Sequence, residues 1–469
     1  MQYDDLEKWA PELAKWAADY HKSLRERPVR AQTAPGEIAA QIPESPPAQP
    51  EQFEQVFEDF GQMIMPGITH WQHPRFFAYF PANASPPSVM AEWLTSALAA
   101  QCMLWQTSPA ATELETVMMA WLRQMIGLPE AFSGVIQDSA SSATLAAILV
   151  ARERALSWKG NSEGLAGHPA CRIYCSTEVH SSIDKACWIS GIGQDNLVKI
   201  PAQGPLRSLD PQALEAAIKS DLDEGHLPAA LIVCIGATAT GSSDDIGAAI
   251  DVASRYGLYV HVDAAWAGTA MICPEYRHLM AGAERADSFV FNPHKWMFTN
   301  FDCSAHFVRD PESLVKTLGI RPSFLETQGR DRIINFSEWS VPLGRRFRAL
   351  KLWFVIRSYG VAELQNKIRA HVTLAVGLAE RLRAEPDFEI VTDPILSLFS
   401  FRFSPSGQDN LDALNARLVD AINDDGRIYI TQTQAEGRYV IRFQVGQTDT
   451  SADDVDMAFN VITELARSL

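Results

Sequence analysis

The chain has 469 residues, of which 47% are hydrophobic and 21% are charged, and its formal net charge is −17 at pH 7. This balance is typical of a globular protein with a large core, and the acidic charge argues against a nucleic-acid-binding surface. The first residues are acidic, and no window holds the roughly 18 consecutive apolar residues of a membrane helix. The seven cysteines are odd in number and scattered, so we expect reduced thiols in a cytoplasmic protein.

Residues 1–27 are predicted to form an amphipathic helix, because apolar side chains recur every three or four positions. The apolar stripe comprises Leu6, Trp9, Leu13, Trp16, Tyr20 and Leu24. A stripe of this size needs a surface to pack against, either in its own chain or in a partner subunit. The proline-rich stretch 33–50 ends the helical pattern and is predicted to be an extended connector.

From about residue 130 the pattern changes to short apolar runs that alternate with alanine-rich helical runs. The predicted strands are GVIQ (134–137), RIYCS (172–176), AALIVCIG (229–236), LYVHVDAAW (258–266) and SFVFNPHKW (288–296). Continuous apolar strands separated by helices indicate a mostly parallel sheet covered on both faces. Ligands of such sheets bind beyond the carboxyl ends of the strands, so polar residues that follow these runs are candidate site residues.

Beyond residue 360 the rhythm changes again and indicates a small α+β domain with antiparallel strands. A helical run over 361–384 precedes strand-like segments at 388–393 and 396–403. A helix at 410–424, a strand pair at 428–433 and 439–445, and a last helix follow. The predicted domains are an N-terminal helical arm and connector (1–84), a large α/β domain (85–360) and a small C-terminal domain (361–469).

Two acidic and hydroxyl-rich positions follow predicted strands. The segment from Asp138 to Ser142 opens a helix, where free N–H groups and hydroxyls suit a phosphate, although Asp and Ser are also ordinary N-caps. Asp263 follows five largely apolar residues, where a carboxylate is costly unless it is paired. It could hold a proton on a ring nitrogen, or it could be a buried acid with structural hydrogen bonds.

Two basic side chains occupy similar positions. Lys295 lies among aromatic and apolar neighbours. In a dry pocket a lysine has a lowered pKa and can form a Schiff base, but a lysine can also reach from a turn into solvent. His180 follows the strand at 172–176, and a single histidine is more often a packing residue than a catalytic one. Its spacing from Cys171, Cys175 and Cys187 fits no common zinc pattern, so we predict no metal.

Together these positions indicate one cofactor. A phosphate cradle, a partner for a pyridinium nitrogen and a Schiff-base lysine are what pyridoxal 5′-phosphate needs from a protein. They occur in this order along the chain, each after a predicted strand. The sequence has no G-x-x-x-x-G-K-[ST], G-x-S-x-G or H-E-x-x-H motif that would indicate another chemistry.

The sequence resembles the group II pyridoxal-phosphate decarboxylases, and within them the aromatic-L-amino-acid decarboxylases. The resemblance covers nearly the whole chain, and the segments that carry it are 70–82, 108–122, 261–268, 286–296, 300–305 and 341–360. It implies fold type I, the aspartate-aminotransferase-like α/β fold. That fold has a mostly parallel seven-stranded sheet in its large domain, an N-terminal helical segment and a small C-terminal α+β domain.

The resemblance also implies roles for the cofactor-binding residues. Lys295 would form the Schiff base, Asp263 would pair with the pyridine nitrogen, His180 would stack over the ring and Ala265 would pack under it. Thr238 would contact the cofactor or support His180. The residues that would bind or approach the phosphate are Ser139, Ala140, Ser141, Asn292 and His294.

The implied substrate is an aromatic L-amino acid. The residues that would line its pocket are Trp71, Tyr79, Phe80, Pro81, His180, Met103 and Gly344. Met103, like Gln101, matches a position that relatives supply from the neighbouring subunit, and Gly344 implies room for a bulky side chain such as indole or catechol. The resemblance further implies a homodimer with the active site at the subunit interface, and the N-terminal helix would form part of that interface.

One position leaves the reaction open. Phe324 stands where the family's decarboxylases carry a tyrosine that donates the proton completing the amine. Relatives with phenylalanine there are often aldehyde synthases, which consume O2 and release aldehyde, CO2, ammonia and peroxide. Because His180 is retained and could protonate instead, decarboxylation to the amine remains the first expectation and aldehyde synthesis the second. A cofactor-binding protein without turnover is a third possibility, against which the intact lysine, aspartate and histidine argue.

Overall fold

The computed structural model describes residues 1–320 and 333–469, and contacts divide the chain into two compact units. The larger unit comprises Ala82–Val372 with Pro394–Leu398, and the smaller comprises Met1–Pro81, Thr373–Asp393 and Phe399–Leu469. The three-part division drawn from the sequence stays a prediction. Within the described ranges, no helix is both long and apolar enough to span a bilayer.

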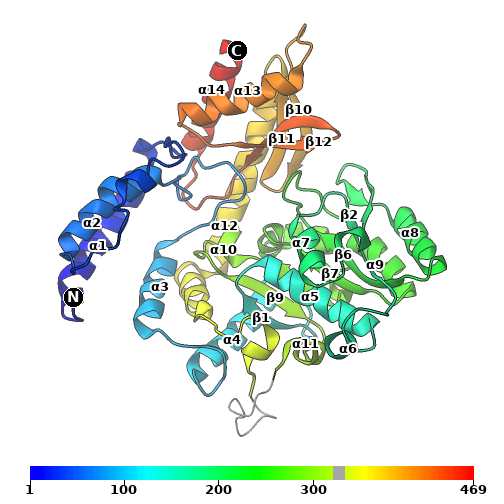
Figure 1. Cartoon of the computed structure of the whole chain (residues 1–469). Helices are drawn as coiled ribbons and strands as arrows, with labels where there is room; N and C mark the ends of the chain where they lie inside the picture. The colour runs from blue at the N-terminus through cyan, green and yellow to red at the C-terminus, as the bar shows by residue number, and fades with distance from the viewer. Residues whose placement is uncertain (321–332) are drawn as a thin grey trace. The chain divides into compact units, whose positions relative to one another are not determined.

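A seven-stranded sheet forms the centre of the larger unit, in the order β1-β9-β8-β7-β6-β2-β3 (Figure 1). The strands are β1 (Ser133–Gln137), β2 (Cys171–Ser176), β3 (Leu197–Ile200), β6 (Leu227–Cys234), β7 (Tyr259–Asp263), β8 (Ser288–Phe291) and β9 (Ser304–Val308). The pairs β3–β2, β2–β6, β6–β7 and β7–β8 are parallel, whereas β9 runs antiparallel to both β1 and β8. The predicted α/β fold with a mostly parallel seven-stranded sheet is confirmed.

Helices bury this sheet, and β7 and β8 are buried at every position. The helices of this unit are α3 (Pro86–Leu98), α4 (Pro109–Ile126), α5 (Ala140–Ala155), α6 (Gly160–Glu163), α7 (Ser182–Ile189), α8 (Pro211–Asp223), α9 (Ile246–Arg255), α10 (Pro293–Trp296) and α11 (Pro311–Leu318). Helix α5 packs against β6, β7, β8 and β9, and a short hairpin pairs β4 (Ala202–Gln203) with β5 (Ser208–Leu209). Helix α12 (Arg348–Ala384) is interrupted by non-helical backbone at Gly360 and divided between the units.

The strand predicted over 288–296 is wrong beyond its fourth residue. Strand β8 ends at Phe291, and Pro293 begins the single helical turn α10. The fixed backbone angle of proline favours the first position of a helix, which explains the change at this point. Lys295 therefore lies on a helical turn beyond the strand rather than on the strand itself.

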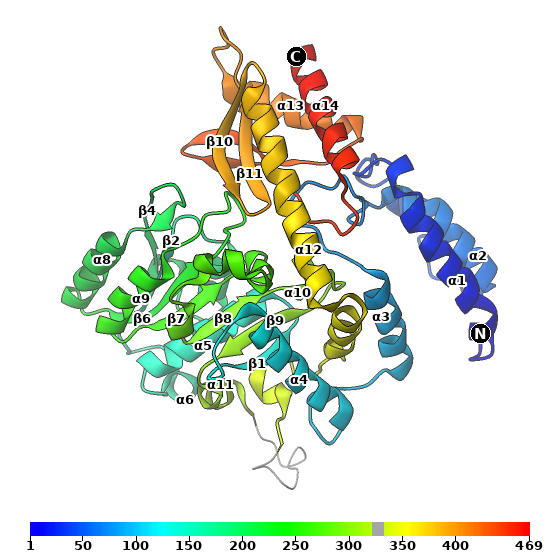
Figure 2. The same ribbon diagram turned by 180° about the vertical axis from the view of Figure 1, so that it is seen from behind.

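The smaller unit contains a four-stranded sheet in the order β10-β11-β13-β12. Its regular elements after residue 372 are β10 (Phe388–Ile395), β11 (Leu398–Phe403), α13 (Leu411–Asp425), β12 (Thr431–Ala435), β13 (Arg438–Gln444) and α14 (Ala452–Ser468). Side chains of β11 and β13 form one apolar core with side chains of α13 and α14. Figure 2 shows the ribbons of β11, α13 and α14. The predicted small C-terminal α+β element is confirmed.

The N-terminal arm of this unit is a pair of helices. Helix α1 (Asp5–Lys22) is shorter than the predicted 1–27 and is followed by the 3-10 turn Leu24–Glu26. Its aromatic stripe packs on α2 (Phe53–Asp59) and the turn after it, with ring centroids of Trp9 and Phe53 4.8 Å apart and those of Trp16 and Phe60 5.3 Å apart. No side chain of α1 is fully buried, so α2 covers the stripe only in part.

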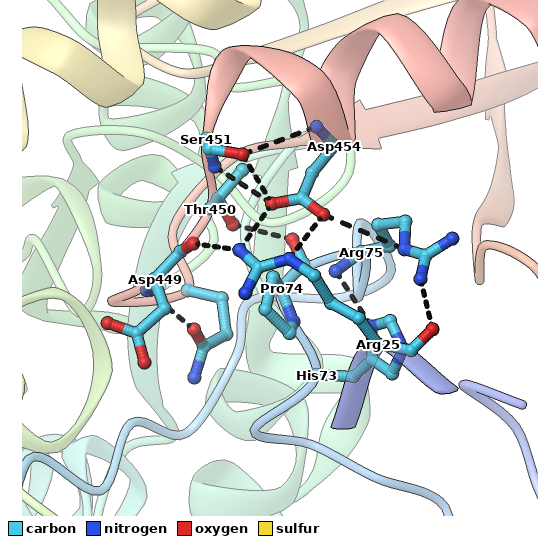
Figure 3. A network of polar contacts seen from close by, with 9 residues as sticks. Arg25, His73, Pro74, Arg75, Asp449, Thr450, Ser451 and Asp454 are labelled. Carbon is cyan, nitrogen blue, oxygen red and sulfur yellow. Dashed lines mark hydrogen bonds and ion pairs between the residues drawn. The ribbon is translucent and has the colours of Figure 1, made fainter. Parts of the chain in front are cut away.

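A polar network ties the arm to the last helix, as Figure 3 shows. Arg25 donates two hydrogen bonds to the Asp454 carboxylate, with N–O distances of 3.1 and 2.8 Å. Asp454 also completes a capping box with Ser451 at the start of α14. Arg75 donates to the backbone carbonyl of Arg25 at 2.5 Å. The buried Asp454 carboxylate thus accepts hydrogen bonds from Arg25, forms an ion pair with Arg75 at 3.7 Å and caps one helix.

Candidate active site

The functional candidates of the larger unit meet beyond the carboxyl ends of β1, β2, β6, β7 and β8. A cavity of about 190 Å³ opens there. All ten residues predicted to bind the cofactor line it, and these are Ser139, Ala140, Ser141, His180, Thr238, Asp263, Ala265, Asn292, His294 and Lys295. Parallel strands bring their carboxyl ends to one edge of the sheet, which is why residues more than 150 positions apart converge.

The cradle at one side of the cavity is the start of α5. Ser139 is the N-cap, and its hydroxyl accepts a hydrogen bond from the N–H of Ser142 at 3.2 Å. The N-cap alternative is therefore real, and it does not exclude an anion. The N–H groups of Ala140 and Ser141, in the first turn, have no acceptor within the helix. They add to the positive end of the helix dipole and suit a phosphate.

Asp263 ends β7 and is buried, with 8% of its surface exposed. Its Oδ1 accepts a 3.0 Å hydrogen bond from the N–H of Ala265. Burial raises the pKa of the Asp263 carboxyl, while the charge of Lys295 and this N–H act to lower it. A cationic ring nitrogen placed in the cavity would lower the pKa further and keep the carboxylate ionised.

Lys295 is half-buried on α10, whereas its neighbours Trp296, Met297 and Phe298 are fully buried. Its backbone is held at both ends, because its N–H donates to the carbonyl of Asn292 at 2.9 Å and its carbonyl accepts from the side chain of Asn83 at 2.6 Å. The aromatic neighbours therefore belong to the core that supports the turn, and Lys295 is the member of this run that lines the cavity.

His180 lies in the loop between β2 and α7, exposed at the cavity. Its Nδ1 accepts the backbone N–H of Ser182 at 3.1 Å, and the Ser182 hydroxyl lies 2.9 Å from the same atom. Loss of solvent lowers the pKa of His180; Asp263 opposes this shift and the charge of Lys295 adds to it. Because a backbone N–H can only donate, the neutral ring carries its proton on Nε2.

Two more donors are oriented in the same way. His294 accepts the N–H of Cys303 on Nδ1 at 2.8 Å, which leaves its proton on Nε2. Burial and the charge of Lys295 lower the pKa of His294 to about 3, so the ring is neutral. The side-chain oxygen of Asn292, Oδ1, accepts a hydrogen bond from the Ser304 hydroxyl at 2.6 Å. The side-chain NH₂ group of Asn292 is therefore the donor that can face the cavity.

These residues fit pyridoxal phosphate. The first turn of α5 offers N–H donors for a phosphate, and Asn292 and His294 offer neutral side-chain donors. At the other side a buried carboxylate, an amine and an imidazole share the cavity. This is the donor set that a phosphorylated aldehyde with a basic ring nitrogen requires.

Several cavity residues were not predicted from the sequence. They are Ser182, Cys234, Gly236, Ala237 and Trp266, and Asn83 stands behind the Lys295 turn. Gly236 had a readable signal in the sequence, since it is the last residue of the strand predicted over 229–236. Its backbone has a φ of +71°, and a Cβ there would lie 2.6 Å from Cβ of Ala267 and 2.8 Å from the Trp266 ring. Only glycine fits this position.

Apart from His180, the predicted substrate residues are not among those that line this cavity. Trp71, Tyr79, Phe80 and Pro81 belong to the smaller unit, where the rings of Trp71 and Tyr79 stack with centroids 5.8 Å apart. In the larger unit, Gly344 lines a second cavity, of about 530 Å³, with Gln101 and not the cavity of Lys295.

Two candidates remain, the substrate residue Met103 and the catalytic residue Phe324. Met103 is half-buried and does not line the Lys295 cavity. Its backbone carbonyl accepts a hydrogen bond from the N–H of Ser337 at 3.1 Å. Phe324 lies outside the described residues. Their predicted roles stay predictions.

Comparison with known proteins gives one consistent answer. Residues 35–404 match the pyridoxal-dependent decarboxylase conserved domain. Tryptophan decarboxylase TDC2 of Camptotheca acuminata is 40% identical over 100% of this chain and 96% of the relative. Phenylacetaldehyde synthase of Arabidopsis thaliana is 38% identical over 100% of this chain and 97% of the relative. The crystal structure of Oryza sativa TDC with PLP and tryptamine superposes with a TM-score of 0.96 at 34% identity, covering 100% of this chain and 99% of that one.

These matches confirm the predicted cofactor and the predicted resemblance. The family match spans the whole of the larger unit, including the three strand ends that carry His180, Asp263 and Lys295. The relatives include both amine-forming and aldehyde-forming enzymes, so both predicted reactions are represented among them. The chain belongs to the family of pyridoxal-dependent decarboxylases.

Proposed function

We propose that the protein decarboxylates an aromatic L-amino acid, namely tryptophan, dopa, tyrosine or phenylalanine, to the amine and CO2. The observation that carries the proposal is the meeting of Lys295, Asp263 and His180 around one cavity with a phosphate cradle. The aromatic substrate class is supported by relatives named for tryptophan and tyrosine decarboxylation, each at 39–40% identity.

The chain's residues divide the work of holding the cofactor. Ser139, Ala140 and Ser141 bind the phosphate at the start of α5, with Asn292 and His294 as additional donors. Lys295 would supply the amine that holds the cofactor through its aldehyde, and Asp263 would be the carboxylate that faces the ring nitrogen. Ala265 and Thr238 shape the cavity around the ring. Bound pyridoxal phosphate supplies an electron-withdrawing ring that accepts the electron pair left when the α-carboxylate departs as CO2.

The reaction further needs a proton donor at the α-carbon. His180 carries a proton on Nε2 and is held by Ser182, so it can donate a hydrogen bond to the substrate at a fixed position. The Lys295 amine, which lines the same cavity, would be a second group that can carry a proton. A cationic ring nitrogen beside Asp263 would offset the cost of its burial, and the ionised carboxylate would in turn stabilise the positive charge of the ring.

Aldehyde synthesis is the second candidate function. It is favoured by Phe324, which cannot donate a proton, and by a phenylacetaldehyde synthase among the relatives. In that reaction the substrate, O2 and water give the aldehyde, CO2, ammonia and hydrogen peroxide. Decarboxylation stays first because His180 is present and correctly protonated.

A homodimer with a shared active site is part of the proposal. Helix α3 exposes a row of large apolar side chains, namely Met90, Trp93, Leu94 and Leu98. The stripe of α1 is likewise only partly covered. Both faces suit burial against a second copy, and Met103 is the residue that each subunit would supply to the substrate pocket of its neighbour. We place the enzyme in the cytoplasm.

A product assay tests the proposal. The holoenzyme is incubated separately with L-phenylalanine, L-tyrosine, L-dopa and L-tryptophan, and CO2, amine, aldehyde and peroxide are quantified. Amine in proportion to CO2, without peroxide, supports the decarboxylase. Peroxide and aldehyde in proportion to CO2 support the synthase instead. Failure to release CO2 from all four, with cofactor bound, contradicts both functions.

A further inference from the structure

Two of the residues that line the Lys295 cavity lie in loops of the larger unit, outside its helices and strands. One joins β2 to α7 and holds His180, and the other joins β6 to α9 and holds Thr238. Each loop also has a polar residue two positions from its cavity residue that does not line the cavity, Glu178 in the first loop and Thr240 in the second.

These two residues join the loops. The Thr240 hydroxyl donates a 2.7 Å hydrogen bond to Oε2 of Glu178. The Arg207 Nε, on the β4–β5 hairpin, lies 3.3 Å from the same oxygen. Thr240 is 1% exposed, and the side chain of Glu178 is 15% exposed. A hydrogen bond to a charged acceptor that is shielded from water is among the stronger ones in a protein.

Both partners of this contact are fixed to their own strands. The Glu178 N–H donates to the Ser176 hydroxyl, at the end of β2, at 3.1 Å. The second loop closes on itself, because the N–H of Ala237 donates to the carbonyl of Ser242 at 2.8 Å and that of Gly241 donates to the carbonyl of Ala237 at 2.8 Å. The Glu178–Thr240 contact therefore connects two well-held strand ends across the loop that presents His180.

We propose that Glu178 is a positioning residue that acts through His180, with Thr240 as its anchor and Arg207 as its counter-charge. The inference rests on the proposed function, in which His180 faces the substrate. Glu178 touches neither the cavity nor the reacting groups, so its effect is to limit where the His180 ring can lie. A displacement of about 1 Å of such a group can cost up to roughly a hundredfold in rate.

Loosening the loop also changes the surroundings of the His180 ring. The charged groups that act on the ring are Asp263 on β7, Lys295 on α10 and Asp184 on α7, and Asp184 is paired with Lys199 at 3.0 Å. His180 is exposed at the cavity, but part of its ring is shielded from solvent in its present position. A ring free to swing outward gains solvent, so its titration moves up toward the ordinary histidine range of about 6.5.

The test is a double-mutant cycle on the holoenzyme with L-tryptophan as substrate. Wild type, Glu178→Ala, His180→Gln and the double variant are compared for kcat and KM. We expect Glu178→Ala to lower kcat by roughly tenfold with little change in KM, and to add little in the His180→Gln background. Thr240→Val should reproduce the loss, and Glu178→Gln, which still accepts from Thr240, should restore part of it.

A second readout does not depend on turnover. The His180 titration is followed by NMR on holoenzyme labelled at the histidine ring carbons, with His180→Gln for assignment. An upward shift in Glu178→Ala supports the inference. Equal and additive losses in both backgrounds, or an unmoved titration with unchanged kcat, would overturn it. Glu163→Ala is the matched control, since it removes a glutamate from an exposed ion pair with Lys159. If wild type itself releases no CO2, the proposed function fails, whereas the NMR shift still tests the loop.

Discussion

The backbone N–H of Ser182 donates to Nδ1 of His180 at 3.1 Å, and this one bond decides which nitrogen of the ring carries the proton. A neutral His180 presents Nε2–H to the cavity. We expect His180→Gln to lower kcat at least about tenfold, because general acid or hydrogen-bonding help is lost. Ser182→Ala keeps the backbone donor and should lose much less. Steady-state kinetics of both variants, at equal cofactor content by absorbance, check this; equal losses would contradict the role of the backbone bond.

Buried neutral histidines make the fold sensitive to acid. Burial lowers the pKa of His306 to about 3, and burial together with Lys295 lowers that of His294 to about 3. Between the unfolded value of about 6.5 and about 3, the unfolded chain binds protons that the folded chain excludes. Each such histidine therefore removes about 1.4 kcal/mol of stability per pH unit as the pH falls through this window.

The measurement is the thermal unfolding midpoint at pH 7.5, 6.5 and 5.5. The midpoint should change little between the first two values and drop below pH 6.5. His306→Gln, which removes one of the excluded protons, should make that drop shallower even if its midpoint is lower throughout. Parallel curves for wild type and variant would show that His306 does not stay neutral when folded.

The carboxylate of Asp454 should anchor the N-terminal arm. Burial acts to raise its pKa, but hydrogen bonds from Arg25 and Ser451 outweigh burial and the pKa is lowered. A lowered carboxyl pKa means that this stabilisation is present above the unfolded value and is lost as the pH falls. Asp454→Asn should cost about 1–3 kcal/mol, since Arg25 is half exposed and part of the pairing is screened.

Limited proteolysis and thermal unfolding at pH 7.5 test this anchor. Asp454→Asn should release the segment around Arg25 to trypsin sooner and lower the unfolding midpoint. Asp453→Asn is the matched control, because Asp453 is an exposed acid in the same helical turn. The same cleavage rate in both variants would argue that the arm is held by its apolar contacts alone.

Phe324 offers a test of the product. Phe324→Tyr introduces a phenol that can donate a proton, so the ratio of amine to aldehyde should rise. If wild type already forms only amine, the ratio cannot rise, and the protonation role then belongs to another group such as His180. An aldehyde-forming wild type whose product ratio is unchanged by Phe324→Tyr would show that position 324 is not the donor position.

The strand ends of the larger unit were predictable because each is marked twice in the sequence. A run of apolar residues predicts the strand, and a polar residue after the run is a candidate for the site. Asp263 after YVHV and His180 after RIYCS are two examples. Lys295 was also found in this way, although proline at 293 turned its segment into helix. Predicting that these residues lie close together did not require the register between strands, because the carboxyl ends of parallel strands lie at one edge of the sheet.

The rest of the site depends on contacts that leave no local pattern. Asn83 bonds the Lys295 carbonyl from 212 residues away, and Glu178 meets Thr240 from 62 residues away. A polar residue in a loop has many possible partners, and only the folded loops select one. Gly344 and Met103 were predicted by resemblance, and they do not line the cavity of their own chain. Their roles in the substrate pocket therefore stay predictions.

The most direct test of the account is to locate the covalent link to the cofactor. The purified holoenzyme is reduced with borohydride, digested and analysed by peptide mass spectrometry, beside Lys295→Ala treated in the same way. We predict a pyridoxyl-phosphate adduct on Lys295, with the Schiff-base absorbance of the wild type absent from Lys295→Ala. An adduct on another lysine, or a wild-type spectrum that Lys295→Ala leaves unchanged, would contradict the assignment of this cavity as the active site.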